Sequence, residues 1–232
     1  MKKHIFLVVF LITTKVILAQ ESKYYFGISY GKSFPIGNFK DDDIHNSDAG
    51  FAENGKKLDI YAGNVLNESV ILTFTFRYQT FDTDIDALFK DLETNNQGTS
   101  FTGSSDSWQT YYLLTGVAYK VNISEKFSFY PRVGLGPMLV SNPKFSITGT
   151  NGNINKEVNR SSKMGIGLGY EFGIGFKRDI GKNLCLIPTF TFSSGFVKIS
   201  DVETTNDNTV TTSNYKPKIL TFNLGLSLAY KF

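Results

Sequence analysis

The sequence is poor in the residues on which most catalytic and metal sites depend. Its 232 residues include one cysteine, Cys185, and two histidines, His4 and His45. One cysteine excludes an internal disulfide. His45 is the only histidine outside the leader described below, so no histidine-based metal cluster and no HExxH motif can form. We therefore expect no enzyme activity, no catalytic residue, no metal and no cofactor.

Long hydrophobic runs are also missing. No stretch after residue 19 approaches the ~18 consecutive apolar residues of a transmembrane helix. The chain begins with a shorter apolar run, 5–12, preceded by Lys2 and Lys3 and followed by a small residue at Ala19. This pattern predicts a secretory signal peptide over 1–19 and a mature domain over 20–232.

The charge of the mature chain is balanced. Lys2, Lys3 and Lys15 belong to the leader, and without them 21 of the 24 basic residues remain, against 21 acidic residues. A net charge near zero gives no support to a nucleic-acid partner.

What the sequence does have is strict alternation, most clearly in its last fifteen residues. Large apolar side chains occupy every second position there, and small, nearly uncharged residues lie between them. A period of two predicts a β-strand with two different faces. One face suits lipid and the other suits a narrow, wet barrel interior. The final apolar positions are Leu224, Leu226, Leu228, Tyr230 and Phe232.

The same alternation predicts seven more strands. The eight expected strands cover 24–32, 56–63, 70–79, 108–121, 127–139, 165–176, 184–196 and 218–232. Their connections are alternately long and short, and 122–125 is expected to be a turn. An even strand number with this asymmetry indicates an all-β, eight-stranded antiparallel transmembrane β-barrel with short periplasmic turns and four long extracellular loops. Apolar residues at helical spacing in 85–92 predict a short helix in the second long loop.

A soluble eight-stranded barrel of the lipocalin kind would show the same period but would turn its apolar face inward. The non-apolar faces of 24–32, 165–176 and 218–232 are mainly Gly, Ser, Thr, Ala and Asn, too small and uncharged for a solvated surface. The apolar faces are too bulky to meet inside eight strands. Both observations favour the membrane barrel.

Two motifs and the overall pattern carry a resemblance. Gly31-Lys-Ser-Phe-Pro-Ile-Gly-Asn-Phe39 and Ser47-Asp-Ala-Gly-Phe-Ala52 are similar to the outer membrane β-barrel domain proteins (PorT-like) of Bacteroidota. The mature chain as a whole resembles OmpA/OmpX-type barrels. The resemblance implies an outer-membrane location in a Gram-negative bacterium with both termini periplasmic, and outer-membrane lipid and the barrel assembly machinery as partners. The apolar positions from Leu224 to Phe232 resemble the assembly signal of such barrels. Since the chain stops at Phe232, no peptidoglycan-binding domain is expected after the barrel.

Charged residues on the polar faces of the strands predict a cluster inside the barrel. Arg77, Arg132 and Glu171 each lie about seven to nine residues from the nearest short turn, and therefore at similar depth. Charges in a narrow barrel need partners, so we expect an Arg77–Glu171–Arg132 cluster, with Asp59 or Lys57 as additional members. The cluster could hold the barrel shut, or it could form a gate or a binding site for a small polar solute.

The second long loop also contains a calcium-like spacing. Asp82, Asp84, Asp86 and Glu93 fall at positions 1, 3, 5 and 12 of an EF-hand loop, but Ala87 replaces the glycine required at position 6. The favoured interpretation is an acidic first turn of the short helix.

The function expected from these features is that of a non-enzymatic, monomeric barrel that is structural or binds a ligand outside the cell through its long loops. The alternative is a narrow, porin-like conduit for small polar solutes.

Overall fold

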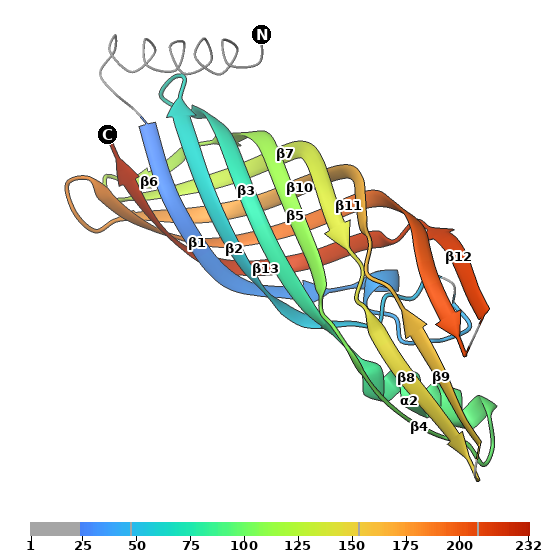
Figure 1. Cartoon of the computed structure of the whole chain (residues 1–232). Coiled ribbons are helices and arrows are strands. Elements are labelled where there is room, and N and C mark those ends of the chain that lie inside the picture. Colours follow the sequence, from blue (N-terminus) through green and yellow to red (C-terminus); the bar gives the residue numbers. More distant parts are fainter. Residues whose placement is uncertain (1–23, 47, 153, 208) are drawn as a thin grey trace, which may run out of the picture.

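The computed structural model describes residues 24–232 except 47, 153 and 208. The predicted signal peptide lies outside the described residues. Eight strands hydrogen-bond in a closed antiparallel ring, in the order β10-β7-β5-β3-β2-β1-β13-β11, and β11 pairs back to β10. Figure 1 shows this barrel with α2 and the strand pairs β8–β9 and β11–β12 extending from one end. The strands of the ring are β1 (Tyr24–Pro35), β2 (Ala52–Val65), β3 (Val70–Thr83), β5 (Trp108–Tyr119), β7 (Phe127–Ser141), β10 (Met164–Asp179), β11 (Leu184–Asn206) and β13 (Lys218–Lys231).

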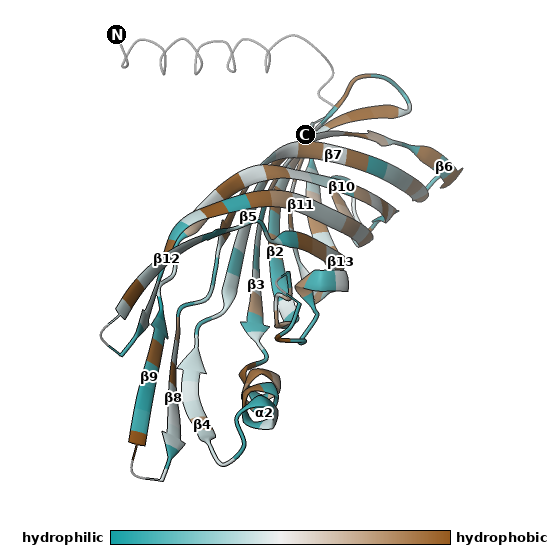
Figure 2. Ribbon diagram, turned by 90° about the vertical axis from the view of Figure 1, so that its right-hand side faces the viewer, coloured by the Kyte–Doolittle hydropathy of each residue, from teal (hydrophilic) through white to brown (hydrophobic). Residues whose placement is uncertain are grey.

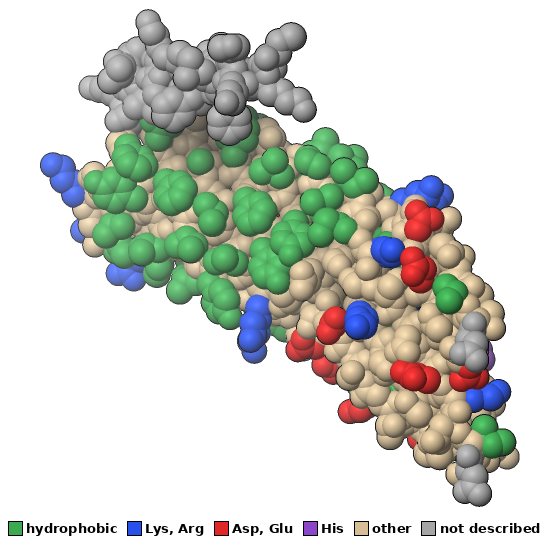
Figure 3. Space-filling view, in the orientation of Figure 1, with side chains coloured by type: hydrophobic (Ala, Val, Ile, Leu, Met, Phe, Trp, Pro, Cys, Tyr) green, Lys and Arg blue, Asp and Glu red, His purple; other side chains and the backbone are tan. Residues whose placement is uncertain are grey.

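The apolar face of each strand points outward. Phe26 is 53% exposed and Leu168 is 52% exposed, whereas Arg77 and Glu171, on the opposite faces, are buried. Hydrophobic side chains cover the barrel wall in Figure 3, and acidic side chains gather toward the loop end of that face. This arrangement confirms the membrane-barrel prediction and is the reverse of a lipocalin. In the described part of the chain, no helix combines the length and the apolar character needed to cross a membrane.

The barrel has two unlike ends. Short connections join β2 to β3, β5 to β7 and β10 to β11, and the first and last described residues, Tyr24 and Phe232, lie at that end (Figure 1). Phe232 donates its backbone N–H to the carbonyl of Tyr24. The long connections leave the other end, and one of them contains α2 (Ile85–Asn95), close to the predicted helix.

The long loops are more ordered than the sequence indicated. The predicted loop at 141–163 contains the hairpin β8 (Phe145–Asn151) and β9 (Ile154–Arg160), and the one at 200–216 contains the end of β11 and β12 (Thr209–Tyr215). With β4 (Ser100–Ser105) from the second loop they form one outer sheet in the order β4-β8-β9-β11-β12, seen beyond the barrel in Figure 2.

β11 belongs to both sheets. Its pairing with β10 ends at Lys198, and its pairing with β9 begins at Thr204. Between them the register with β12 shifts, and Asp201 adopts a left-handed backbone with a φ of 58°. Such a bulge bends a strand, so β11 can leave the barrel wall and enter the outer sheet.

The predicted turn at 122–125 was wrong in detail. Residues 121–124 form the short strand β6 (Val121–Ser124), which pairs with β7, so the chain turns at Glu125 and Lys126. Strand β2 also begins earlier than expected, at Ala52, because its pairing with β3 continues through an irregularity between Ala52 and Gly55.

Candidate functional site in the barrel lumen

The lumen has three layers, which can be followed along the inward face of β3. Phe81 lies nearest the long loops, Gln79 and Arg77 lie in the middle, and Thr75 and Ile71 lie toward the short turns. Alternate residues of a strand share a face, so a single strand contributes side chains to all three layers.

The middle layer is a chain of ion pairs. Glu171 Oε2 lies 2.5 Å from Arg77 Nη1, and Oε1 lies 2.9 Å from Arg132 Nη2. Arg77 Nε lies 2.7 Å from Asp59 Oδ1, and Asp59 Oδ2 lies 2.8 Å from Lys57 Nζ. The structure thus brings together the three residues of the expected cluster, Arg77, Arg132 and Glu171, and both of the expected additional members, Asp59 and Lys57. Residues from four strands, β2, β3, β7 and β10, meet because they lie at one depth of the closed ring.

Uncharged polar groups extend this layer across the barrel. Gln79 donates from Nε2 to Ser33 Oγ and to Asn223 Oδ1, each at 2.7 Å. Ser193 Oγ accepts from Arg77 at 2.8 Å and lies 3.1 Å from Asn223 Nδ2, which donates to it. Sequence reasoning missed these residues because small polar side chains on a lumen face carry no distinctive signal. A buried polar layer with its partners supplied internally resists rearrangement.

The layer nearest the long loops is apolar, which was not expected of a lumen. Phe39, from the short 3₁₀ helix η1 (Gly37–Phe39) in the first loop, packs edge-on against Phe81 and Trp108. Trp108 donates its indole N–H to the carbonyl of Gly50 at 2.9 Å, which ties this loop to the barrel mouth. The buried apolar cluster that contains this layer continues to Tyr112 and Leu114, beside Arg77 and Thr75. Its members are Phe39, Ala52, Phe81, Trp108, Tyr112, Leu114, Met138, Val140, Val197, Ile199, Val202 and Ile219.

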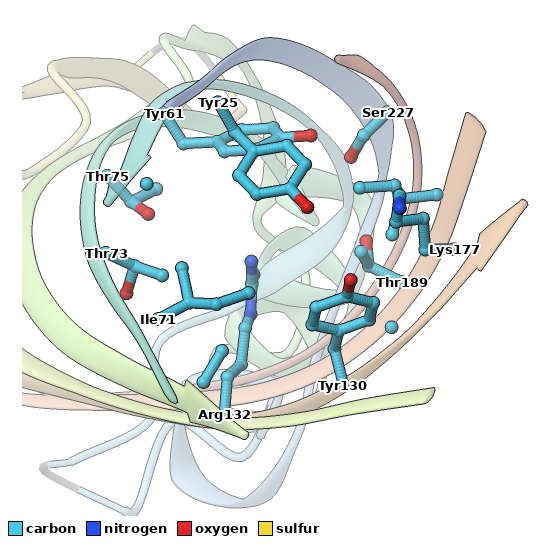
Figure 4. A pocket seen from close by; sticks show the side chains of 14 residues that line it. Tyr25, Tyr61, Ile71, Thr73, Thr75, Tyr130, Arg132, Lys177, Thr189 and Ser227 are labelled. Atoms are coloured by element: carbon cyan, nitrogen blue, oxygen red, sulfur yellow. The ribbon is translucent and has the colours of Figure 1, made fainter. Parts of the chain in front are cut away.

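The glycines of β10 have different roles. A Cβ on Gly169 would lie 2.6 Å from the Tyr112 ring, so that glycine makes room for an aromatic side chain rather than a hollow. Gly175, nearer the short turns, borders a cavity of about 70 Å³. Figure 4 shows Tyr25 from β1 and Tyr130 and Arg132 from β7 extending into this cavity. The lumen is therefore closed toward the loops and hollow toward the short turns.

The outer sheet is held together by cation–π contacts as well as by the backbone hydrogen bonds between its strands. The Arg160 guanidinium of β9 lies 4.5 Å from the Tyr215 ring centroid on β12 and 5.6 Å from the Phe145 ring centroid on β8. Burial raises the pKa of the Tyr215 hydroxyl, and the nearby Arg160 opposes that shift. Cation–π contacts of this kind contribute about 0.5–2 kcal/mol, so Arg160 joins three strands from two loops.

The acidic residues at calcium-like spacing do not come together in one site. Asp84 caps α2 by accepting from the Ala87 N–H at 2.9 Å, and Asp82 accepts from Ser107. Among the described residues, no group of acidic, histidine or cysteine side chains is arranged to hold a metal ion. Cys185 is buried, as a packing residue would be. The proposed assembly-signal positions all lie on the outward face of β13 or at its end: Leu224, Leu226, Leu228, Tyr230 and Phe232.

No protein-family model matches the sequence, and no curated protein matches it. Solved structures do match. A major outer membrane protein of Thermus thermophilus is 16% identical, with a TM-score of 0.51, over 90% of this chain and 99% of that one. Ail, the attachment invasion locus protein of Yersinia pestis, is 17% identical, with a TM-score of 0.47, over 92% and 100%. OprG of Pseudomonas aeruginosa is 9% identical, with a TM-score of 0.43, over 92% and 98%.

At these identities the likeness concerns the fold. The chain has the fold of an outer-membrane β-barrel, with eight strands in the closed ring. The finer resemblance to the PorT-like group of Bacteroidota stays a prediction.

Proposed function

We propose that the protein is a non-enzymatic, monomeric integral protein of the outer membrane of a Gram-negative bacterium and that it binds a ligand outside the cell through its outer sheet. The observation that carries the proposal is the contrast between a filled lumen and an ordered extension. The apolar and ion-pair layers occupy the loop-side half of the lumen, so little is left for transport there. The long loops instead build a sheet.

The outer sheet has features suited to binding. Its edge strands among the described residues are β4 and β12, whose outer sides have no strand partner. Unpaired strand edges offer backbone donors and acceptors to an incoming chain. Ile154 and Val210, at strand ends of this sheet, are 65% and 61% exposed. Both features lie on the side we assign to the cell exterior, whereas the short turns and both chain ends are assigned to the periplasm, where the assembly machinery acts.

The orientation can be tested by labelling cysteines on intact cells. Lys156→Cys places a thiol on exposed β9, and Glu68→Cys places one in the exposed turn between β2 and β3. A membrane-impermeant maleimide should label the first on intact cells and the second only after the outer membrane is permeabilised. The buried Cys185 of the parent protein supplies the background. Labelling of Glu68→Cys alone on intact cells would reverse the orientation.

Conductance distinguishes the proposal from the narrow-conduit alternative. The mature protein, refolded into a planar bilayer, should give no steady openings. Folding of the protein sample is checked by the heat-dependent shift of its band on a detergent gel. Discrete openings that change with Arg132→Gln would contradict a closed lumen and would favour a conduit.

Binding by the outer sheet can be tested by shortening one hairpin. Vesicles carrying the protein without residues 149–156 keep the whole barrel but lose the tip of β8–β9. On an array of matrix proteins and polysaccharides, wild-type vesicles should be retained on at least one surface, and the shortened protein should be retained less. Equal retention of both on every surface contradicts a role for this sheet in binding.

A further inference from the structure

The hollow part of the lumen is lined by hydroxyl-bearing and cationic side chains together with small and apolar residues. It lies between the ion-pair layer and the short turns, and all eight strands of the barrel wall contribute to its lining. In Figure 4, Tyr25, Tyr130 and Arg132 lie around its centre. The lining residues are Tyr25, Tyr61, Gly63, Ile71, Thr73, Thr75, Ala118, Tyr130, Arg132, Gly175, Lys177, Ile187, Thr189 and Ser227.

The charges around this cavity do not cancel. The ion-pair layer contains three cations, Lys57, Arg77 and Arg132, and two carboxylates, Asp59 and Glu171. With all five ionised, one positive charge remains. No carboxylate lines the cavity, whereas Arg132 and Lys177 both do. Lys177 Nζ lies 3.0 Å from Asp179 Oδ1, but the same oxygen also forms an ion pair with Lys231 Nζ at 3.0 Å. An uncompensated charge in a poorly solvated space is costly.

One donor at the cavity is also unused. The Nε–H of Arg132 makes no hydrogen bond within the described part of the chain. The hydroxyl of Tyr130, which is only 8% exposed, has the hydroxyls of Tyr25 and Ser128 as its neighbours. Buried polar groups are normally satisfied, so an unused guanidinium donor beside a positively charged cavity indicates a missing acceptor.

We propose that this cavity binds a small carboxylate anion of about the size of acetate. A guanidinium edge flanked by hydroxyls matches the hydrogen-bonding pattern of a carboxylate. The volume of about 70 Å³ exceeds the roughly 10–15 Å³ that one water requires, so a few non-hydrogen atoms fit. The anion would neutralise the remaining charge and accept from Arg132 and Tyr130. The loop-side layers close the other route, so it enters from the short-turn end. This site is independent of binding at the outer sheet.

The direct test observes the Arg132 side chain. In the refolded, ¹⁵N-labelled protein, the Nε–H resonance of Arg132 is assigned by its loss in Arg132→Gln. Sodium acetate then replaces sodium gluconate, a bulkier anion, at constant ionic strength. The Arg132 resonance should shift and saturate. The resonance of Arg178, an exposed arginine on the outward face of β10, should stay in place and serves as the internal control.

Two further measurements locate the anion and its class. Tyr130→Phe removes one hydroxyl and no charge, and it should weaken acetate binding about tenfold, the loss of one hydrogen bond to a charged group. Arg178→Gln, the matched surface variant, should leave the affinity unchanged. Inorganic phosphate should bind more weakly than acetate, because it is larger.

Four results would overturn the proposal. They are an Arg132 resonance that does not move, one that moves linearly together with Arg178, an unchanged affinity in Tyr130→Phe, and saturable binding of phosphate without binding of acetate. The first two mean that the cavity holds only water, the third places the anion elsewhere, and the fourth excludes the carboxylate class.

Discussion

Neutralising Glu171 provides the sharpest test of the ion-pair layer. The Glu171 side chain is 4% exposed and contacts Arg77 and Arg132, which are 0% and 15% exposed. Glu171→Gln keeps the shape of the side chain but leaves three cations facing one carboxylate. Breaking a buried pair by removing the charge of one partner costs about 3–5 kcal/mol. We expect the free energy of unfolding to fall by that amount.

The control is an ion pair of the same type in a different setting. Glu203 pairs with Lys163 on the loops at 3.3 Å, with side chains 53% and 39% exposed. Exposed pairs contribute about 0.2–1 kcal/mol, so Glu203→Gln should change stability much less. Unfolding is followed in urea, in lipid vesicles, by the fluorescence of Trp108. It is the only tryptophan in the sequence and lies in the apolar layer, 5% exposed.

A double variant checks the cause. If Glu171→Gln acts by leaving buried cations without an anionic partner, then adding Arg132→Gln removes one of these cations and should recover part of the lost stability. The coupling between the two positions is then measured directly. Equal effects of Glu171→Gln and Glu203→Gln, or additive losses in the double variant, would refute the reasoning that the layer is dry and that Glu171 pairs with both of its arginines there.

Three further outcomes follow from the fold. Gly31→Ala should lower the folded fraction on a detergent gel, because a Cβ there would lie 1.8 Å from the carbonyl oxygen of Leu224; an unchanged fraction would show that β1 and β13 can separate locally. Asp84→Ala should destabilise α2 by about 1 kcal/mol through loss of its cap, read as faster amide exchange over 85–95 with β3 unaffected. Deleting Phe232 should reduce insertion into the outer membrane in cells while refolding in detergent stays normal, and normal insertion would exclude an assembly role for this residue.

The barrel could be predicted because both of its surfaces impose a period of two. Lipid selects large residues such as Leu226 and Leu228, and the narrow interior selects small ones such as Ser227 and Ala229. The ends of strands were less predictable. Strand β1 continues to Pro35, beyond the expected end near Lys32, because its partner β13 extends equally far.

Strand β12 of the outer sheet was missed because it is exposed at almost every position. Thr209–Tyr215 is polar at almost every position, so it shows no alternation and reads as a loop. Its Thr and Val residues do favour extended backbone, and that composition was the available signal. The same reasoning explains the lumen. Depth counting along strands placed Arg77, Arg132 and Glu171 at one level, but nothing local indicated that Phe39 would fold back from the first loop onto Trp108.

The mixed origin of the outer sheet limits how the loops can be exchanged. Its strands come from three separate connections, and each inner strand receives backbone hydrogen bonds from a neighbour encoded elsewhere. The β8–β9 hairpin grafted alone onto another barrel would keep its own ladder but lose β4 on one side and β11 on the other. Arg160 would likewise lose Tyr215. The transplantable unit is the complete set of three loops together with the bulged end of β11.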